Sequence, residues 1–287
     1  MTSPTPIDQY AVVGHPIAHS QSPFIHAAFA LATGQTLSYG RLLVPLDDFA
    51  GALRRWVAAA EGGTVRGCNV TVPFKFEAFG LTKRRTPRAE LAGAANVLSF
   101  ETDGWLADNT DGVGLVADIE RNAGVPLAGR RVLLIGAGGA AAGTVGALLA
   151  AGPAQLTVTN RTLDKARALV TRFAPMAGGT RLAAAPLVDC GEAFDVVING
   201  TSSSLQGADI PVAASVLAPG ALAVDMMYGP AAQPFIDWAG RHGAMGRDGL
   251  GMLVEQAAEA FALWRRVRPE TAPVLAALRE RLASAAR

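Results

Sequence analysis

The sequence predicts an α/β protein of two domains, each built on a mostly parallel sheet. Three observations support this fold class. The chain has 287 residues, enough for two domains that each bury a core. Short apolar runs alternate with helical stretches in both halves, which is the pattern of a parallel sheet covered by helices. A glycine-rich turn also joins a strand-like run to a helical one at residues 131–150. We therefore expect two domains.

The composition excludes several classes of function. Half of the residues are hydrophobic, 17% are charged and the net charge is +1, so nothing indicates a nucleic-acid-binding surface. The two cysteines, Cys68 and Cys190, lie far apart without zinc or disulfide spacing, so we expect both in the core and no metal site. The first ten residues, "MTSPTPIDQY", lack the basic and apolar regions of a signal peptide. These features favour a cytoplasmic protein.

One uncharged stretch, residues 132–154, is long enough on paper to span a membrane. Its front end, "VLLIGAGG", changes character as a strand entering a turn does, and the rest is rich in glycine and alanine. We therefore interpret it as a strand, a turn and a buried helix, and expect no membrane partner.

The first part of the chain alternates strands and helices in order. Residues 22–34 form a helix with Ser22 as cap, Pro23 at its first position and a closing glycine. Further helices are expected at 46–60 and 74–80, and strands at 10–14, 37–44 and 65–73. Residues 96–108 predict two antiparallel strands around a turn at Asp103-Gly104.

The second part begins with a helix at residues 113–124 and continues as a second strand–helix series. Its expected strands are 131–136, 155–160, 194–200 and 221–229, and two long helices, 249–267 and 271–287, close the chain. Residues 174–186, "APMAGGTRLAAAP", are expected to form a loose surface segment.

Gly136, Gly138 and Ala141 form the pattern G-x-G-x-x-A between a strand and a helix. The first glycine permits the tight turn, the second lets the backbone approach a pyrophosphate, and the small third residue allows close packing. The helix N-terminus attracts the phosphates. Tight turns need glycine for other reasons too, but the surrounding strand and helix favour a dinucleotide site.

The end of the next strand indicates which dinucleotide binds. An NAD site places an acidic residue there, whereas this chain has Asn160, Arg161 and Thr162, followed by Lys165. Arginine suits the planar contacts of a 2′-phosphate, so the sequence predicts NADP. A solvated helix start with an incidental arginine is the alternative.

Polar residues gather at strand–helix junctions in the first domain. Ser20 and Ser22 precede a helix, where they form either a cap or a carboxylate cradle. Asn69 and Thr71 lie on one face of a strand by period 2, with Lys75 beyond its end. Asn96 follows in "GAAN", and "DNTDG" adds Asp108, Asn109 and Asp111. Each of these residues alone is more often a turn former or a cap.

Lys75 is one of only three lysines in the chain, the others being Lys83 and Lys165. Arginine keeps its proton at any relevant pH, whereas burial and neighbours can tune a lysine into an acid–base group. We therefore expect Lys75 to transfer a proton and Asp111 to pair with it.

At this point the chain resembles the shikimate dehydrogenase family. The resemblance runs in family order over nearly the whole chain, through "HSQSP", "NVTVPFK", "GAAN", "DNTDG", "GAGGA", "NRT", "DMMYG" and "DGLGMLVEQAA". It implies reversible, NADPH-dependent reduction of 3-dehydroshikimate to shikimate, in the pathway to aromatic amino acids.

The resemblance also implies roles for individual residues. The catalytic pair would be Lys75 and Asp111. The substrate site would comprise Ser20, Ser22, Asn69, Thr71, Asn96, Tyr228 and Gln256. The cofactor site would comprise Gly136, Ala137, Gly138, Gly139, Ala140, Asn160, Arg161, Thr162, Lys165, Thr201, Met226 and Gly249. The resemblance further implies a substrate domain over residues 1–111, completed by C-terminal helices at 248–287 that pack back on it, and a Rossmann domain over 112–247. The protein would be a monomer or a homodimer.

The chain departs from the family pattern at a few positions. Val97 stands where threonine is usual, Gly200 and Ser204 replace the usual alanine and glycine of "NATSSGL", and Lys165 stands where arginine is frequent. Three alternatives remain open: a quinate/shikimate dehydrogenase, an enzyme acting on an amino analogue of shikimate, and a non-catalytic NADP-binding regulator. The last would not need Lys75 and Asp111 together.

Overall fold

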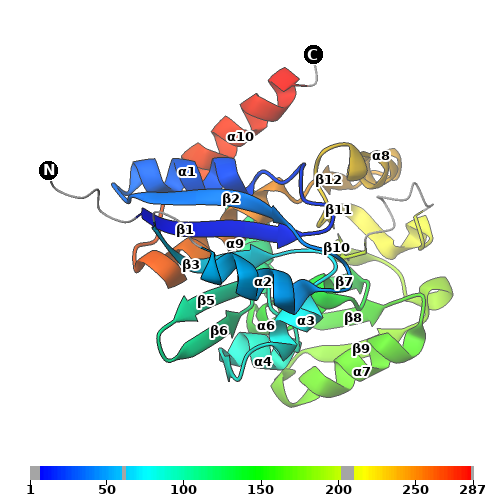
Figure 1. The fold of residues 1–287 in the computed structure, drawn as a ribbon. Coiled ribbons are helices and arrows are strands. Elements are labelled where there is room, and N and C mark those ends of the chain that lie inside the picture. The colour runs from blue at the N-terminus through cyan, green and yellow to red at the C-terminus, as the bar shows by residue number, and fades with distance from the viewer. Residues whose placement is uncertain (1–6, 60–62, 202–209, 286–287) are drawn as a thin grey trace, which may run out of the picture. The chain divides into compact units, whose positions relative to one another are not determined.

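The computed structural model describes residues 7–59, 63–201 and 210–285. It divides into two compact units. The first unit comprises Met1–Thr110 and Gln256–Arg287, and the second comprises Asp111–Glu255. Each unit is built on its own six-stranded sheet, as the predicted fold class requires (Figure 1).

The sheet of the first unit has the strand order β2-β1-β3-β5-β6-β4. Its strands are β1 (Ile7–Gly14), β2 (Leu37–Leu43), β3 (Gly63–Val70), β4 (Arg84–Arg85), β5 (Val97–Glu101) and β6 (Gly104–Asp108). Strand β1 pairs in parallel with β2 and β3, and β4 with β6, whereas β5 is antiparallel to β3 and β6. The hairpin at Asp103-Gly104 is confirmed, because Glu101 pairs with Gly104 across the turn.

Helices cover this sheet. They are α1 (Ser22–Ala32), α2 (Phe49–Ala58), α3 (Lys75–Gly80), α4 (Pro87–Ala92), α10 (Ala272–Ala285) and the later part of α9 (Leu250–Arg265). Helix α1 packs on β2, and α10 packs on α1, so α10 and the part of α9 from Gln256 onward belong to the first unit. The predicted cap was wrong, because Ser22 is the first residue of α1 and Gln21 takes the cap position without a side-chain hydrogen bond. The ring of Phe49, the first residue of α2, stacks on the ring of Phe74 with 4.7 Å between the ring centroids. Both side chains are buried.

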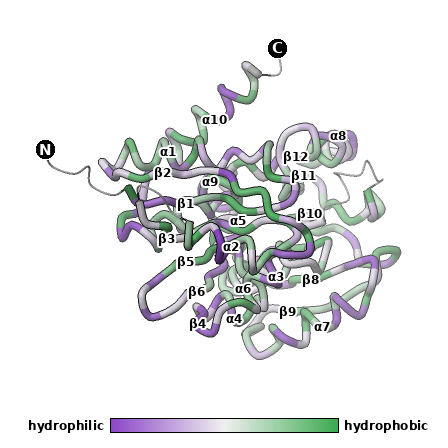
Figure 2. The backbone as a smooth tube through the Cα atoms, in the orientation of Figure 1, coloured by the Kyte–Doolittle hydropathy of each residue, from purple (hydrophilic) through white to green (hydrophobic). Residues whose placement is uncertain are grey.

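Strand β4 and helix α4 are elements that the sequence patterns did not indicate. Thr86 caps α4 by accepting a hydrogen bond from the Ala89 amide, Pro87 starts the helix, and Gly93 ends it with φ of 60°. Strand β4 is short and strongly hydrophilic, whereas the C-terminal end of β1 is apolar (Figure 2). Local caps and tertiary contacts therefore form this element without a long periodic pattern.

The sheet of the second unit has the order β12-β11-β10-β7-β8-β9, and every adjacent pair is parallel (Figure 1). Its strands are β7 (Arg131–Ile135), β8 (Gln155–Thr159), β9 (Arg181–Ala185), β10 (Phe194–Asn199), β11 (Leu217–Asp225) and β12 (Met245–Arg247). This is the order 3-2-1-4-5-6 of a doubly wound dinucleotide-binding fold.

The helices of the second unit are α5 (Asp111–Ala117), α6 (Gly139–Ala150), α7 (Leu163–Phe173), α8 (Gln233–Arg241) and the start of α9. Helix α5 continues as a π-helix over Asp118–Asn122. The buried Asp118 carboxylate accepts two hydrogen bonds from Arg247, at 2.9 and 2.6 Å, and a third from the Asn122 amide.

Two predictions for this unit had opposite outcomes. The uncharged stretch at 132–154 is indeed a strand followed by helix α6, and among the described residues no helix is long and apolar enough to cross a membrane. The prediction of a loose segment at 174–186 was wrong for residues 181–185, which form edge strand β9. Its sequence, "RLAAA", lacks β-branched and aromatic residues, so pairing with β8 determines the strand.

Candidate functional site

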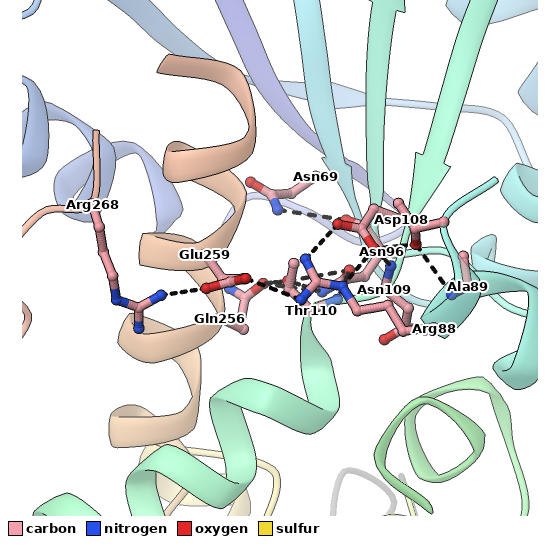
Figure 3. Close-up of polar contacts among 11 residues, drawn as sticks. Asn69, Arg88, Ala89, Asn96, Asp108, Asn109, Thr110, Gln256, Glu259 and Arg268 are labelled. Atoms are coloured by element: carbon pink, nitrogen blue, oxygen red, sulfur yellow. Dashed lines mark hydrogen bonds and ion pairs between the residues drawn. The ribbon is translucent and has the colours of Figure 1, made fainter. Parts of the chain in front are cut away.

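The predicted site residues lie in two polar regions, one in each unit. The region of the first unit centres on the Asn96 side chain, which immediately precedes β5 (Figure 3). Its amide nitrogen donates to the Thr110 hydroxyl at 2.9 Å and to Gln256 Oε1 at 3.1 Å. Its amide oxygen accepts from the Thr110 backbone amide at 2.8 Å. Asn96 and Gln256 are both buried, although 160 residues separate them. Two predicted substrate residues are thus brought together.

Asn69, at the end of β3, extends this network. Its amide nitrogen donates to the Asn96 carbonyl at 3.5 Å, and its Oδ1 accepts from the Tyr39 hydroxyl at 2.6 Å. The two serines at the start of α1 lie together as well, because the Ser20 hydroxyl donates to the Ser22 oxygen at 3.2 Å. Arg41 donates two hydrogen bonds to the Ser20 carbonyl, which fixes the loop in place. Both serines are buried, and the geometry suits a small polar group such as a carboxylate.

Lys75 is the first residue of α3 and is half-buried. The turn before it is held by backbone hydrogen bonds from Thr71 to Val13 and from Phe74 to Thr71. The Lys75 carbonyl accepts from the Ala95 amide at 2.9 Å, so the lysine backbone lies beside the segment that carries Asn96. Lys75 thus follows shortly after the end of β3, the strand that carries Asn69.

An ion pair between Arg88 and the buried Asp108 lies next to Asn96 (Figure 3). The Asp108 carboxylate, at the end of β6, is fully buried and accepts two hydrogen bonds from Arg88, at 2.6 and 2.5 Å. It also accepts from the Thr86 hydroxyl and the Asn109 amide. Burial raises the pKa of Asp108, but Arg88 and these donors outweigh it, so the pKa lies below its usual value.

Arg88 also reaches α9. Its guanidinium donates to Glu259 at 3.0 Å, and Arg268 pairs with the other oxygen of the same carboxylate. Helix α4, strand β6 and helix α9 are therefore tied together around the residues that flank Asn96. Sequence patterns pointed to Asp108 and Asn109 but not to Arg88 or Glu259, because a distant ion pair leaves no local signal.

In the second unit, the glycine turn lies between β7 and α6 as predicted. Gly136 has φ of +114°, and a Cβ there would lie 3.1 Å from the backbone of Gly200, so only glycine fits. A Cβ on Gly138, the cap of α6, would meet nothing within 4 Å, so space lies open before the helix N-terminus. The remaining turn residues, Ala137, Gly139 and Ala140, are half-buried.

The carboxyl ends of strands β10 and β11 carry further predicted cofactor residues. The Asn199 side chain donates to Asp225 at 3.0 Å and accepts from the Thr201 hydroxyl at 2.7 Å. Met226 follows directly, and a Cβ on Gly249 would lie 2.5 Å from its carbonyl oxygen. Thr201, Met226 and Gly249, three predicted cofactor residues, thus surround the carboxyl ends of β10 and β11. Tyr228 is half-buried two residues further on.

The carboxyl end of β8 carries the predicted 2′-phosphate clamp. Arg161 and Lys165 are exposed, and neither side chain forms an ion pair with another described residue. The Asn160 amide donates to the Thr162 carbonyl at 2.9 Å, which shapes the turn into α7. The only acid in the first turn of this helix, Asp164, pairs with Arg167 at 3.0 Å. Net positive charge therefore surrounds the position where an NAD site has an acid.

The residues of the second unit fit a bound dinucleotide phosphate. The open space before α6 suits a pyrophosphate, and Arg161 with Lys165 suits a further phosphate on the ribose. Asp111 begins α5 and is buried. It follows Thr110 directly in the chain, so the connected backbone carries it from the polar network of the first unit into the second. Its catalytic role remains a prediction.

Three family models match the chain. They describe a shikimate dehydrogenase substrate-binding domain at residues 12–98, a shikimate/quinate 5-dehydrogenase at 119–209 and a shikimate 5′-dehydrogenase C-terminal domain at 249–279. The shikimate dehydrogenase (NADP⁺) of Methylibium petroleiphilum is 60% identical over 276 residues, with 95% of this chain and 94% of the relative covered.

Solved structures agree with this assignment. An Ael1 enzyme from Pseudomonas putida superimposes with a TM-score of 0.84 at 46% identity, covering 94% of this chain and 98% of that one. The shikimate 5-dehydrogenase of Thermus thermophilus, in complex with NADP(H) and shikimate, gives 0.80 at 30% identity, covering 96% and 99%. On these matches over nearly its full length, the chain belongs to the shikimate dehydrogenase family.

Proposed function

We propose that this protein is an NADP-dependent shikimate dehydrogenase, which reversibly reduces 3-dehydroshikimate to shikimate. The observation that carries the proposal is the buried network of Asn96, Thr110 and Gln256 beside Asn69 and Lys75 in the first unit. Such a set of amide and hydroxyl groups binds a polyol, and the family match names the relatives' substrate.

NADPH is the cofactor that the second unit supports. The α6 N-terminus with Gly136 and Gly138 would hold the pyrophosphate, and Arg161 with Lys165 would hold the 2′-phosphate. Thr201, Met226 and Gly249 would line the nicotinamide pocket at the ends of β10 and β11. When bound, the cofactor supplies the hydride that the ketone carbon receives.

The substrate would bind mainly to residues of the first unit. Ser20 and Ser22 would hold its carboxylate, while Asn69, Thr71, Asn96 and Gln256 would bind the ring hydroxyls. Tyr228 would complete the site. The Lys75 ammonium would protonate the ketone oxygen as it becomes an alcohol, and the Asp111 carboxylate would orient that lysine. We further propose that the protein is cytoplasmic and acts as a monomer or homodimer.

An absorbance assay tests this proposal. The purified protein is incubated with shikimate or quinate, each with NADP or NAD, and the reduced cofactor is followed. We expect turnover with shikimate and NADP to exceed every other combination. Comparable turnover with quinate would point to a quinate/shikimate dehydrogenase. No turnover in any combination, with NADP binding intact, would indicate a non-catalytic regulator.

A further inference from the structure

Tyr39 connects two groups of predicted substrate residues, yet no sequence pattern marks it. It lies on β2, the edge strand of the first sheet, and its ring is partly buried. Its hydroxyl donates to Asn69 Oδ1 at 2.6 Å, and the Ser22 side chain interacts with the same phenol. Ser22 in turn accepts from Ser20. One hydroxyl therefore stands between the serine pair and the asparagine.

The contact with Tyr39 decides how the Asn69 amide is oriented. An amide oxygen only accepts hydrogen bonds, and an amide nitrogen only donates them. Because the phenol hydroxyl donates to Oδ1, the Nδ2 group of Asn69 must lie on the other side, where one N–H is directed to the Asn96 carbonyl. Burial raises the pKa of Tyr39, so the phenol stays protonated and remains a donor.

His26 fixes the position of the phenol ring. The two rings stack in parallel, with centroids 4.0 Å apart and an interplanar angle of 5°. His26 is buried, and neither of its ring nitrogens has a hydrogen-bond partner among the described residues. Burial lowers the pKa of His26 to about 3, although the nearby Asn69 side chain acts in the opposite direction, so the imidazole is neutral at physiological pH. Phe29, Phe261 and Trp264 surround it.

We propose that Tyr39 is a positioning residue of the substrate site: its hydroxyl presents the Asn69 amide nitrogen to the substrate and holds Ser22 beside it, while the stacked His26 ring keeps the phenol in place. This inference rests on the proposed function. It assigns to Tyr39 an effect on substrate affinity and none on the cofactor, whose residues lie in the second unit.

The Tyr39→Phe variant tests the proposal, because it keeps the ring and its stack and removes only the hydroxyl. The loss leaves the buried Asn69 oxygen without its donor, which releases the amide to rotate. We expect KM for shikimate to rise about 5- to 50-fold. The expected change in KM for NADP is less than about twofold. A residue with only a packing role would leave KM for shikimate unchanged.

Tyr10→Phe is the matched control. Tyr10 lies on the adjacent strand β1, and its ring packs against that of Trp264 with 4.7 Å between the centroids. Its hydroxyl interacts with Arg265 rather than with a predicted site residue. Removal of the Tyr10 hydroxyl should leave KM for shikimate and KM for NADP at the wild-type level. Melting temperatures of both variants verify that they fold.

A double-variant cycle adds a second readout. Tyr39 acts through Asn69, so the effect of Tyr39→Phe on KM should largely disappear in an Asn69→Ala background. Should Tyr39→Phe not fold, His26→Leu replaces it, since this variant keeps the hydroxyl but removes the stack. It too should raise KM for shikimate, and an unchanged KM would overturn the proposal.

The outcomes separate this inference from the proposed function. A wild-type protein without activity on shikimate would remove the proposed function and this inference with it. An active wild type whose Tyr39→Phe variant has an unchanged KM, or one whose effects simply add to those of Asn69→Ala, would overturn only the role of Tyr39.

Discussion

Asp108 shows how much a single buried charge depends on its partners. Its carboxylate is fully buried, and Arg88 holds both oxygens while Thr86 and the Asn109 amide complete the shell. Replacing this carboxylate by an amide removes the charge that faces Arg88 and sets a buried amide nitrogen against hydrogen-bond donors, which costs more than the loss of an exposed pair. This residue therefore stabilises the strand end from which the "NTD" segment departs.

We predict that Asp108→Asn destabilises the protein by about 3 kcal/mol at neutral pH. In a protein of this size, that corresponds to a fall of about 5 to 10 °C in melting temperature. Asp164→Asn is the matched control, because its pair with Arg167 is exposed; it should change stability by less than about 1 kcal/mol.

The pH dependence of this effect has a defined sign. Because the pKa of Asp108 is lowered in the folded protein, its stabilisation is present above the unfolded pKa of about 3.9 and is lost as pH falls through the folded value. The difference in melting temperature between the wild type and Asp108→Asn should therefore shrink in acid. A difference that stays constant from neutral pH into acid would contradict this account.

Arg161 is the residue on which cofactor choice should depend most. Its exposed guanidinium stands at the end of β8 without an ion-pair partner among the described residues, so it is available for a phosphate. We predict that Arg161→Ala raises KM for NADP about 10- to 100-fold, the worth of a charged hydrogen bond. KM for NAD should not change.

Steady-state kinetics with each cofactor measure this preference. Arg167→Ala, on helix α7 just beyond Arg161 and paired with Asp164, serves as the control and should leave KM for NADP near its wild-type value. If Arg161→Ala raised both KM values equally, Arg161 would contribute to general charge and not to recognition of the 2′-phosphate.

At the scale of elements, strand ends position the site in both units. Asn69 lies at the end of β3, Asp108 ends β6, and Met226 follows β11, so each side chain is placed by a strand whose register is fixed by its neighbours. Parallel α/β sheets bind ligands at the carboxyl ends of their strands. The sheet thus fixes these groups more firmly than a loop would.

The contact between the start of α9 and the end of β11 requires glycine at 249. A Cβ there would overlap the Met226 backbone at 2.5 to 2.7 Å, and neither group can move without shifting a strand end. We predict that Gly249→Ala destabilises the protein by about 1 to 3 kcal/mol. It should also raise KM for NADP, because Met226 lies in the proposed cofactor pocket.

Thermal unfolding and cofactor kinetics measure both effects. Gly240→Ala is the control, since Gly240 lies in α8 and a Cβ there meets nothing within 4 Å. It should leave KM alone and keep or slightly raise stability. A Gly249→Ala protein with wild-type melting temperature and KM would show that the backbone yields at this position.

Sequence patterns predicted most elements but not all. Short runs of apolar residues predicted β7, β8, β10 and β11, because strands of a parallel sheet are buried on both faces. Strand β9 was missed because its alanines carry no strand signal and pairing with β8 determines it. Helix α4 was missed because a cap at Thr86 and an ion pair at Arg88 define it.

The site divides in the same way. Glycines and polar residues in short motifs indicate their own chemistry, so Gly136, Asn96 and Lys75 could be selected from sequence. Tyr39 and His26 could not, since "LSYGRLL" and "SPFIHAA" fit ordinary core elements. Their contribution arises from a ring stack and a hydrogen bond between residues 13 to 30 positions apart, which only the fold brings together.

For the whole molecule, the proposed reaction distributes its groups over the two units. Residues proposed for the substrate lie mainly in the first unit, and those proposed for the cofactor lie in the second. The chain passes between the units twice, once between Thr110 and Asp111 and once within α9 after Glu255. Lys75 belongs to the first unit and Asp111 to the second, so the proposed chemistry needs both.

The most direct test of this account is the steady-state oxidation of shikimate with NADP by Lys75→Met, beside the wild type and a Lys83→Met control. Loss of the proton-transferring ammonium should lower kcat about 10²- to 10⁴-fold, while KM for shikimate changes only a few-fold and the control matches the wild type. A Lys75→Met protein that retains the wild-type kcat and loses only substrate affinity would contradict the proposed role of this lysine in proton transfer.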